Sequence, residues 1–237
     1  QVEEDESWAV IGPSGCGKST LLYLLAGLRQ ASGGEIWIAG QRLLRPRPRT
    51  GLILQDYGLL PWATVAENAG LGLRVRRFYG PDGRHAPSGP RVQHQEIAQR
   101  VDHWLHRLGI GSLSDQYPSQ ISGGQRQRAA IARTLAMRPD LLLMDEPFSS
   151  LDALTREDLE RLTLELRAET AVTTVIVTHN IEEAVYMGQH LLVMKQPPQS
   201  KPLIIANPAA GQLDYREKAA FQTRCSEVRD LLGRQDA

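Results

Sequence analysis

The sequence predicts an α/β protein built on a mostly parallel sheet, and three observations support this fold class. An apolar run at 8–11 leads into the glycine-rich segment 12–20 and then into a second apolar stretch at 21–26. Two further apolar runs, at 141–144 and 173–178, each end in polar residues suited to chemistry. Short apolar runs of this kind are typical of strands buried in a parallel sheet. We therefore expect ligand-binding residues to gather where these strands end.

The segment 12–20 has the spacing G-x-x-x-x-G-K-[ST]. In this pattern backbone N–H groups surround phosphates, and the lysine reaches their β/γ end. The predicted helix at 21–26 adds unpaired N–H donors and the positive end of its dipole. A plain glycine turn before a core helix is the alternative. The residues expected to contact a nucleoside triphosphate are Gly12, Pro13, Ser14, Gly15, Cys16, Gly17, Lys18, Ser19 and Thr20.

Chain length, charge and cysteine content limit the number of domains, the type of partner and the compartment. A chain of 237 residues with 41% hydrophobic residues fits one large domain, or one domain with an inserted subdomain, although two domains are possible on length. Basic and acidic residues balance at 27 each, so nothing favours nucleic acid as a partner. The two cysteines are too few for a disulfide framework and favour a reducing compartment.

The sequence predicts no membrane-spanning segment. No apolar run approaches the roughly 18 residues needed to cross a bilayer, and the acidic segment 3–6 is unlike a signal peptide. If the protein works at a membrane, we expect other chains to cross it.

The segment between the glycine-rich loop and residue 95 is predicted in four parts. Residues 35–40 alternate as a strand, and 41–49 follow as a solvated loop. A buried strand at 51–54 ends at Gln55, which places this side chain within reach of the nucleotide. The apolar segment 58–65 contains Pro61, so it is either a loop packed inward or an exposed patch for a partner. The polar segment 76–95 shows no periodicity and is predicted to be a surface insertion.

Two helices are predicted in the next segment. Apolar residues recur at helical spacing from Ile97 to Leu108, and Gly109 follows as a stop signal. A second helix opens at Ser122, a favoured N-cap, and runs to about Met137. Because glycines leave the first N–H donors open, the segment 122–125 is predicted to bind a second anion, with a simple helix cap as the alternative.

Acidic residues and a histidine end two buried strands. The strand at 141–144 delivers Asp145 and Glu146, which point to opposite faces and so need different partners. We expect Asp145 to join a Mg²⁺ shell and Glu146 to orient or deprotonate an attacking water. His179 ends the strand at 173–178, and because other candidate residues end strands in the same way, a role at the γ-phosphate is favoured over a structural one. Acids that merely cap a strand are the alternative for the carboxylates.

The remaining segments are predicted to form a turn, two helices and a strand. Residues 149–152 form a turn, and Leu159, Leu162 and Leu166 mark the core face of the helix that follows. After 197–198 a strand at 202–206 leads to a terminal amphipathic helix at 221–232, which packs on the domain or forms a dimer contact.

Six short motifs resemble those of the ATP-binding subunit of ABC transporters, in that family's order and over nearly the whole chain. They are the Walker A loop at 12–20, the Q-loop glutamine Gln55, the signature L-S-G-G-Q at 121–125, the Walker B strand at 141–145 with the catalytic glutamate Glu146, the D-loop at 150–152 and the switch histidine His179. The resemblance implies a P-loop NTPase core with an inserted helical subdomain. It divides one domain into a core at 1–56 and 139–195, a helical part at about 57–138 and a C-terminal part at 196–237.

The same resemblance implies a mechanism. Two copies pack head to tail, and each ATP lies between one copy's Walker A loop and the other's signature. The implied catalytic residues are Lys18, Gln55, Glu146 and His179. The implied Mg²⁺ ligands and sensors are Ser19, Gln55 and Asp145. The further nucleotide contacts are Ser122, Gly123, Gly124, Gln125 and Asp152.

At the subfamily level the chain is similar to the ATPases of nitrate, sulfonate and taurine importers. The segments that carry this similarity are 60–62, 151–157 and 179–185. It implies two membrane permease subunits, an extracytoplasmic substrate-binding protein and a peripheral position on the cytoplasmic face of the inner membrane. The permease would then dock on 58–65. A soluble ABC ATPase of translation or repair, and a nucleotide-binding module without hydrolysis, are the rival hypotheses.

Three features of the sequence depart from the family pattern. Residue 121 is isoleucine where leucine is usual, and the insertion at 76–95 is longer than is typical. The chain also begins eleven residues before Gly12, so the family's adenine-stacking aromatic is absent and Trp8 lies too close to replace it. From this we expect an N-terminally truncated chain with weakened adenine binding.

Overall fold

The computed structural model describes residues 1–79, 93–196 and 202–233. The strands are β1 (Ser7–Ile11), β2 (Trp37–Ile38), β3 (Gln41–Arg42), β4 (Thr50–Ile53), β5 (Leu141–Asp145), β6 (Thr173–Thr178), β7 (His190–Val193) and β8 (Leu203–Ala206). The α-helices are α1 (Lys18–Leu25), α2 (Val65–Tyr79), α3 (His94–Arg107), α4 (Gly123–Leu135), α5 (Ala153–Thr170), α6 (Ile181–Met187) and α7 (Ala219–Gly233). Short 3₁₀ turns lie at Gly111–Leu113, Pro118–Gln120 and Tyr215–Glu217.

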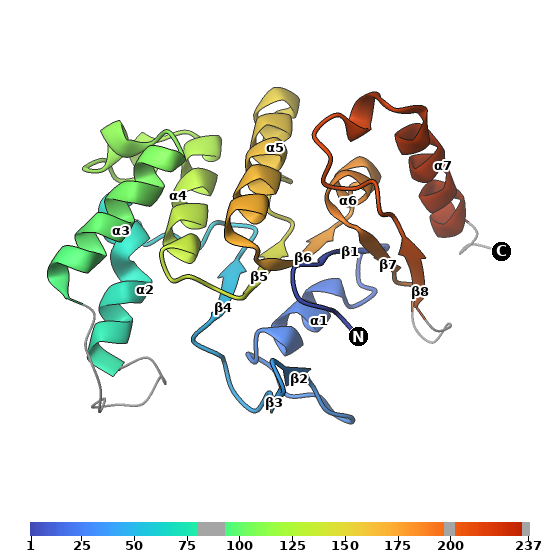
Figure 1. The fold of residues 1–237 in the computed structure, drawn as a ribbon, viewed down its shortest axis with the longest axis horizontal. Helices are drawn as coiled ribbons and strands as arrows, with labels where there is room; N and C mark the ends of the chain where they lie inside the picture. The colour runs from blue at the N-terminus through green and yellow to red at the C-terminus, as the bar shows by residue number, and fades with distance from the viewer. Residues whose placement is uncertain (80–92, 197–201, 234–237) are drawn as a thin grey trace.

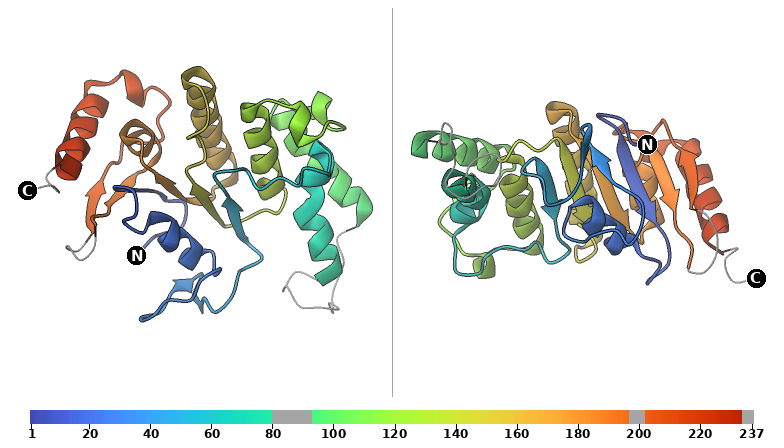
Figure 2. Two further views of the ribbon diagram at one scale, coloured as in Figure 1. Left: turned by 180° about the vertical axis from the view of Figure 1, so that it is seen from behind. Right: turned by 90° about the horizontal axis from the view of Figure 1, so that it is seen from below.

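The main sheet has the strand order β4-β5-β6-β1-β7-β8. All neighbouring pairs are parallel except β7 and β8, which are antiparallel. Figures 1 and 2 show α1 on one face of this sheet and α5, α6 and α7 on the other. The predicted α/β class with a mostly parallel sheet is confirmed.

Successive side chains of β1 point to opposite faces of the sheet and belong to two separate hydrophobic clusters. Trp8 and Val10 of β1 pack with Leu22 of α1, whereas Ala9 and Ile11 belong to the larger cluster on the opposite face. The β1 residues are buried on both faces because the α1 cluster covers one face and the larger cluster, with α6, covers the other. This explains why the strand is a continuous apolar run rather than an alternating one.

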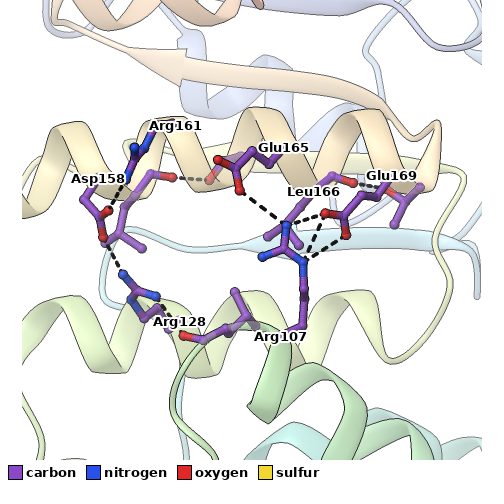
Figure 3. Close-up of polar contacts among 11 residues, drawn as sticks. Arg107, Arg128, Asp158, Arg161, Glu165, Leu166 and Glu169 are labelled. Carbon is purple, nitrogen blue, oxygen red and sulfur yellow. Dashed lines mark hydrogen bonds and ion pairs between the residues drawn. The ribbon is translucent and has the colours of Figure 1, made fainter. Parts of the chain in front are cut away.

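Helices α2, α3 and α4 form a group beside β4, and ion pairs join this group to the core (Figures 1 and 3). Arg107 at the end of α3 donates to both carboxylate oxygens of Glu169 on α5, with Nε 3.1 Å from each. Arg128 of α4 pairs with Asp158 of α5 and donates to the carbonyl oxygen of Leu108 at 2.7 Å. The group corresponds to the helical part expected at about 57–138, although that division of the domain stays a prediction.

Helix α2 was not predicted, and the expected insertion at 76–95 was wrong at its two ends. Arg76 and the residues up to Tyr79 complete α2, while His94 begins α3; residues 80–92 lie outside the described part of the chain. A local signal for this helix exists in the sequence. Thr64 and Glu67 form a capping box, in which each backbone N–H donates to the other side chain.

Two further predictions need correction. The strand expected at 35–40 is reduced to β2, because only two residues pair with the equally short β3. The segment 41–49 is therefore not all loop. The helix expected to be buried at 21–26 begins earlier, at Lys18, and of its residues only Lys18 and Leu22 are buried.

Besides α2 and β3, two further elements were not predicted. Helix α6 has seven residues and β7 has four. Both are too short for hydrophobic periodicity to identify them. Within the described part of the chain, no helix has the length and apolar character needed to cross a membrane.

Candidate nucleotide site

In the loop between β1 and α1, the Lys18 side chain is hydrogen-bonded to the backbone of the same loop. The ammonium group of Lys18 donates to the carbonyl oxygens of Gly12 at 2.8 Å and Pro13 at 3.0 Å. Gly17, the N-cap of α1, has φ 104° and provides no side chain to accept from the first turn. The N–H groups at the start of α1 are therefore left without a side-chain cap, as an anion site requires.

Gly12 is required by packing as well as by its place in the motif. A Cβ atom at this position would lie 2.6 Å from the carbonyl oxygen of Met194 and 2.8 Å from the Cys16 sulfur. Cys16 is buried, so it has little room to move. The segment after β7 thus fixes the floor of the loop, a contact with no sequence signal.

Ser19 and Asp145 meet at the start of α1 and the end of β5. The Ser19 hydroxyl donates to Oδ1 of Asp145 at 3.0 Å, and Asp145 is buried. A hydroxyl and one carboxylate are the hard oxygen donors that Mg²⁺ takes from a protein when water and phosphate supply the rest. Among the described residues no group of three or more His, Cys, Asp and Glu side chains is arranged to hold a metal ion. The donor set therefore fits Mg²⁺ better than a metal that needs a full protein cage.

Glu146 and His179 form the second pair at this edge. Oε2 of Glu146 lies 3.1 Å from Nδ1 of His179. As the sequence predicted, the two neighbouring acids have different partners: Asp145 contacts Ser19, and Glu146 contacts His179. Glu146 has φ 45°, a left-handed conformation that is rare outside glycine and is held here by its N–H donating to Val177 at 2.8 Å.

Gln55 reaches this pair only indirectly. It follows β4 and is exposed, and its Nε2 lies 3.5 Å from the hydroxyl oxygen of Ser149. Ser149 in turn donates from its hydroxyl to the carbonyl oxygen of Glu146 at 3.0 Å. Ser149 was assigned no role from the sequence beyond its place in a turn. Its link between Gln55 and Glu146 requires the tertiary structure to be seen.

The segment 122–125 is a complete capping box. Ser122 Oγ accepts from the Gln125 N–H at 3.3 Å, and Gln125 Oε1 accepts from the Ser122 N–H at 2.8 Å. A Cβ on Gly124 would lie 2.6 Å from the Thr155 methyl carbon, so α4 packs closely on the start of α5. The predicted N-cap is confirmed.

The described residues include no hydrogen bond between 122–125 and the loop at 12–20. Figures 1 and 2 place α4 with α2 and α3 at the β4 end, whereas α1 lies against β5 and β6. Asp152 is likewise occupied locally, since it caps α5 by accepting from the Thr155 N–H at 3.0 Å. This hydrogen bond lowers the pKa of the exposed Asp152 carboxyl. The structure thus brings 12–20, Asp145, Glu146 and His179 together and leaves 122–125 apart.

Comparison with known proteins gives consistent results. The family model described as ABC transporter matches residues 1–149. The taurine import ATP-binding protein TauB of Escherichia coli is 41% identical over 197 residues, which cover 83% of this chain and 72% of TauB. The aliphatic sulfonates import ATP-binding protein SsuB of Bacillus cereus is 38% identical over 207 residues, 87% of this chain and 76% of SsuB.

A solved structure is also similar. It is the post-hydrolysis dimer of the ATP-binding cassette MJ0796 bound to ADP and Pi, with a TM-score of 0.69 and 29% sequence identity. The match covers 86% of this chain and 88% of the MJ0796 chain.

The crowding at Gly12 leads to a stability prediction. Replacing Gly12 by Ala should lower the free energy of unfolding by about 1–3 kcal/mol, because the new methyl group overlaps a backbone carbonyl and the Cys16 sulfur. Thermal and urea denaturation measure this change. Gly33→Ala is the matched control, since a Cβ at that position would meet nothing within 4 Å and its φ is not positive. Equal stability of the two variants would contradict the packing role of Gly12.

Proposed function

This chain belongs to the ABC transporter family of ATP-binding proteins, and from that premise we propose that it is the ATP-hydrolysing subunit of a bacterial importer for taurine, sulfonates or a similar small anion. The cargo class is suggested by TauB and SsuB, whose names specify taurine and aliphatic sulfonates. The observation that carries the enzymatic part is the pairing of Ser19 with Asp145 and of Glu146 with His179 at one sheet edge.

The proposed catalytic roles follow from these contacts. Lys18 exchanges the carbonyl oxygens of Gly12 and Pro13 for the β- and γ-phosphates. Ser19 and Asp145 would hold Mg²⁺, which when bound neutralises charge that develops on the phosphates. Gln55, which lies beside Ser149, would contribute its side-chain amide to Mg²⁺ and to the attacking water.

Glu146 is proposed as the base that orients and deprotonates the attacking water. With a proton on each ring nitrogen, His179 would donate from Nδ1 to Glu146 and from Nε2 to a γ-phosphate oxygen. Because phosphoryl transfer depends mainly on positioning and charge stabilisation, this pair would contribute by holding the water and the γ-phosphate in place.

A second copy of the chain is proposed to complete each site. The helix start at 122–125 suits an anion but makes no hydrogen bond with its own phosphate loop among the described residues. In a head-to-tail dimer it would face the ATP held by the partner, together with the D-loop carrying Asp152. The similar cassette MJ0796 is a dimer in its ADP and Pi complex.

The permease contact is proposed at 58–65, which shows both of the behaviours expected from the sequence. Ala63 and Val65 are buried, whereas Trp62 is 74% exposed. Asn68 is buried; its Oδ1 accepts from the Leu60 N–H at 2.7 Å, and its Nδ2 donates to the carbonyl oxygens of Leu60, Ala63 and Thr64. An indole held outward by a rigid loop suits an apolar partner surface, here the cytoplasmic side of two permease subunits.

Replacing Glu146 by Gln tests the catalytic assignment. Loss of the base should lower kcat by at least about 100-fold, while nucleotide affinity stays within about threefold because Lys18 and the loop are unchanged. Steady-state phosphate release and fluorescent nucleotide titration measure the two quantities. Unchanged turnover would remove Glu146 from the role of base.

The dimer proposal is tested by two variants at Ser122. Ser122→Asp and Ser122→Asn both preserve an N-cap oxygen, so α4 should remain intact. Only the aspartate adds a negative charge that repels a triphosphate. In a Glu146→Gln background, ATP should therefore dimerise the Asn variant and not the Asp variant, as measured by light scattering after size exclusion. Equal dimerisation would argue against a phosphate contact at 122–125.

Co-purification separates the importer from its rivals. Expressed with the permease subunits of its own operon, the tagged chain should be recovered with both of them from detergent-solubilised membranes. The Trp62→Ala variant should lose them while still hydrolysing ATP. A stable complex with ribosomes or DNA, and none with the permeases, would favour a soluble ABC ATPase.

A further inference from the structure

Glu183 is a buried acid that the proposed mechanism does not use. It lies in α6, four residues after His179, and is only 2% exposed. Its Oε2 accepts a hydrogen bond from the Thr178 hydroxyl at 3.0 Å. Its Oε1 is fully buried and has no hydrogen-bond partner in the described part of the chain. A polar group in this state needs an explanation, because an unpaired buried oxygen is costly.

The charges around Glu183 disfavour its ionised form. Glu160 and Arg156 face it from α5, and Glu146 faces it from the end of β5. The nearby Arg216, before α7, is paired with Glu160, which is fully buried. Arg156 donates to two backbone carbonyl oxygens and forms no ion pair with Glu183 among the described residues. A carboxylate at 183 would therefore be a buried charge without its own counter-ion. Burial, followed by repulsion from Glu160, raises the pKa of Glu183 to about 8.

Glu183 is also part of a closed ring of hydrogen bonds around His179. Thr178 donates to Glu183, and the same Thr178 oxygen accepts from the Asn180 N–H at 3.0 Å. The Asn180 side chain accepts from the backbone N–H groups of Glu182 and Glu183, at 2.9 and 3.3 Å. The backbone of His179 is thus fixed on both sides, while its side chain is 60% exposed and free to meet a ligand.

We propose that Glu183 is a positioning residue for ATP hydrolysis: as a neutral carboxylic acid it anchors the Thr178–Asn180 turn and so aims His179 at Glu146 and at the γ-phosphate. This inference rests on the proposed role of His179. Ionisation of Glu183 would add repulsion from Glu160 and Glu146, and this repulsion would displace the side chain from the Thr178 hydroxyl. The turn then loses the geometry that keeps the imidazole 3.1 Å from Glu146.

The proposal fixes the direction of a pH effect. The neutral form is required, so hydrolysis falls as pH rises through about 8, where folded Glu183 loses its proton. The same group makes folding less favourable as pH rises from the ordinary value of 4.5 to about 8, because only the unfolded chain is then ionised at this position. Above about 8 that cost is constant.

The decisive comparison is between Glu183→Gln and the unaltered chain. Glutamine has nearly the same shape as the neutral acid and cannot ionise. At pH 7 the variant should keep kcat within about twofold, and its alkaline decline should move upward by at least about one pH unit. Glu182→Gln, an exposed neighbour on the same helix, is the matched control and should reproduce the original profile. The measurement is kcat for phosphate release from pH 6 to 10.

A second variant separates positioning from binding. Glu183→Ala removes the acceptor of the Thr178 hydroxyl, and a misplaced His179 should lower kcat by roughly 10- to 100-fold. KM for ATP should change less than about threefold, because the phosphate loop is untouched. If this variant does not fold, the glutamine variant carries the test alone.

Three outcomes are distinguishable. An alkaline decline that is the same in Glu183→Gln and in the unaltered chain overturns the role of Glu183, even where Glu183→Ala is impaired. A His179→Ala variant with full kcat overturns both this inference and the proposed role of His179. Loss of activity in His179→Ala together with a shifted decline in Glu183→Gln supports both.

Discussion

The parallel register of β1, β6 and β5 is the constraint on which the site depends. Ile11 of β1 pairs with Thr178 of β6, and Val177 of β6 pairs with Asp145 of β5. Three segments far apart in the sequence therefore leave the sheet at the same edge, and the first residues after them are the phosphate loop, His179 and Glu146. A slip of one residue would turn every side chain of a strand to the opposite face. The two buried cores oppose such a slip, because each needs its own set of side chains.

Within this frame the chemistry is arranged by local backbone geometry rather than by side chains alone. Glu146 adopts a left-handed conformation directly after β5, so its carboxylate leaves the direction of the strand and meets His179 instead of Ser19. Lys18 donates to loop carbonyl oxygens, which keeps a buried ammonium paired; in the proposed mechanism phosphate replaces them. Both features place charged groups close to the positions proposed for them in hydrolysis. The left-handed conformation of Glu146 costs conformational free energy.

The face of the sheet opposite α1 carries an unusual concentration of buried acids. Glu160 and Glu183 are both almost fully buried, and one arginine, Arg216, pairs with the first. The raised pKa of each is caused mainly by burial. These groups lie on α5 and α6, which follow the D-loop turn and the His179 turn. The turns that carry the proposed site residues are therefore each followed by a helix that contains a buried acid with a raised pKa.

The sequence by itself determined the fold class, the central strands and the order of the motifs, because each depends on neighbouring residues or on fixed spacing. The phosphate loop, the Ser122 N-cap and the different partners of Asp145 and Glu146 were all predicted in this way. The tertiary structure decided what depends on distant partners. Helix α2 was missed because its apolar residues alternate with arginines along its last turns, and α6 and β7 were too short to show a period. The crowding at Gly12 comes from Met194, and the environment of Glu183 comes from α5 and β5. No local pattern records such contacts, since burial is set by whatever the rest of the chain packs against a residue.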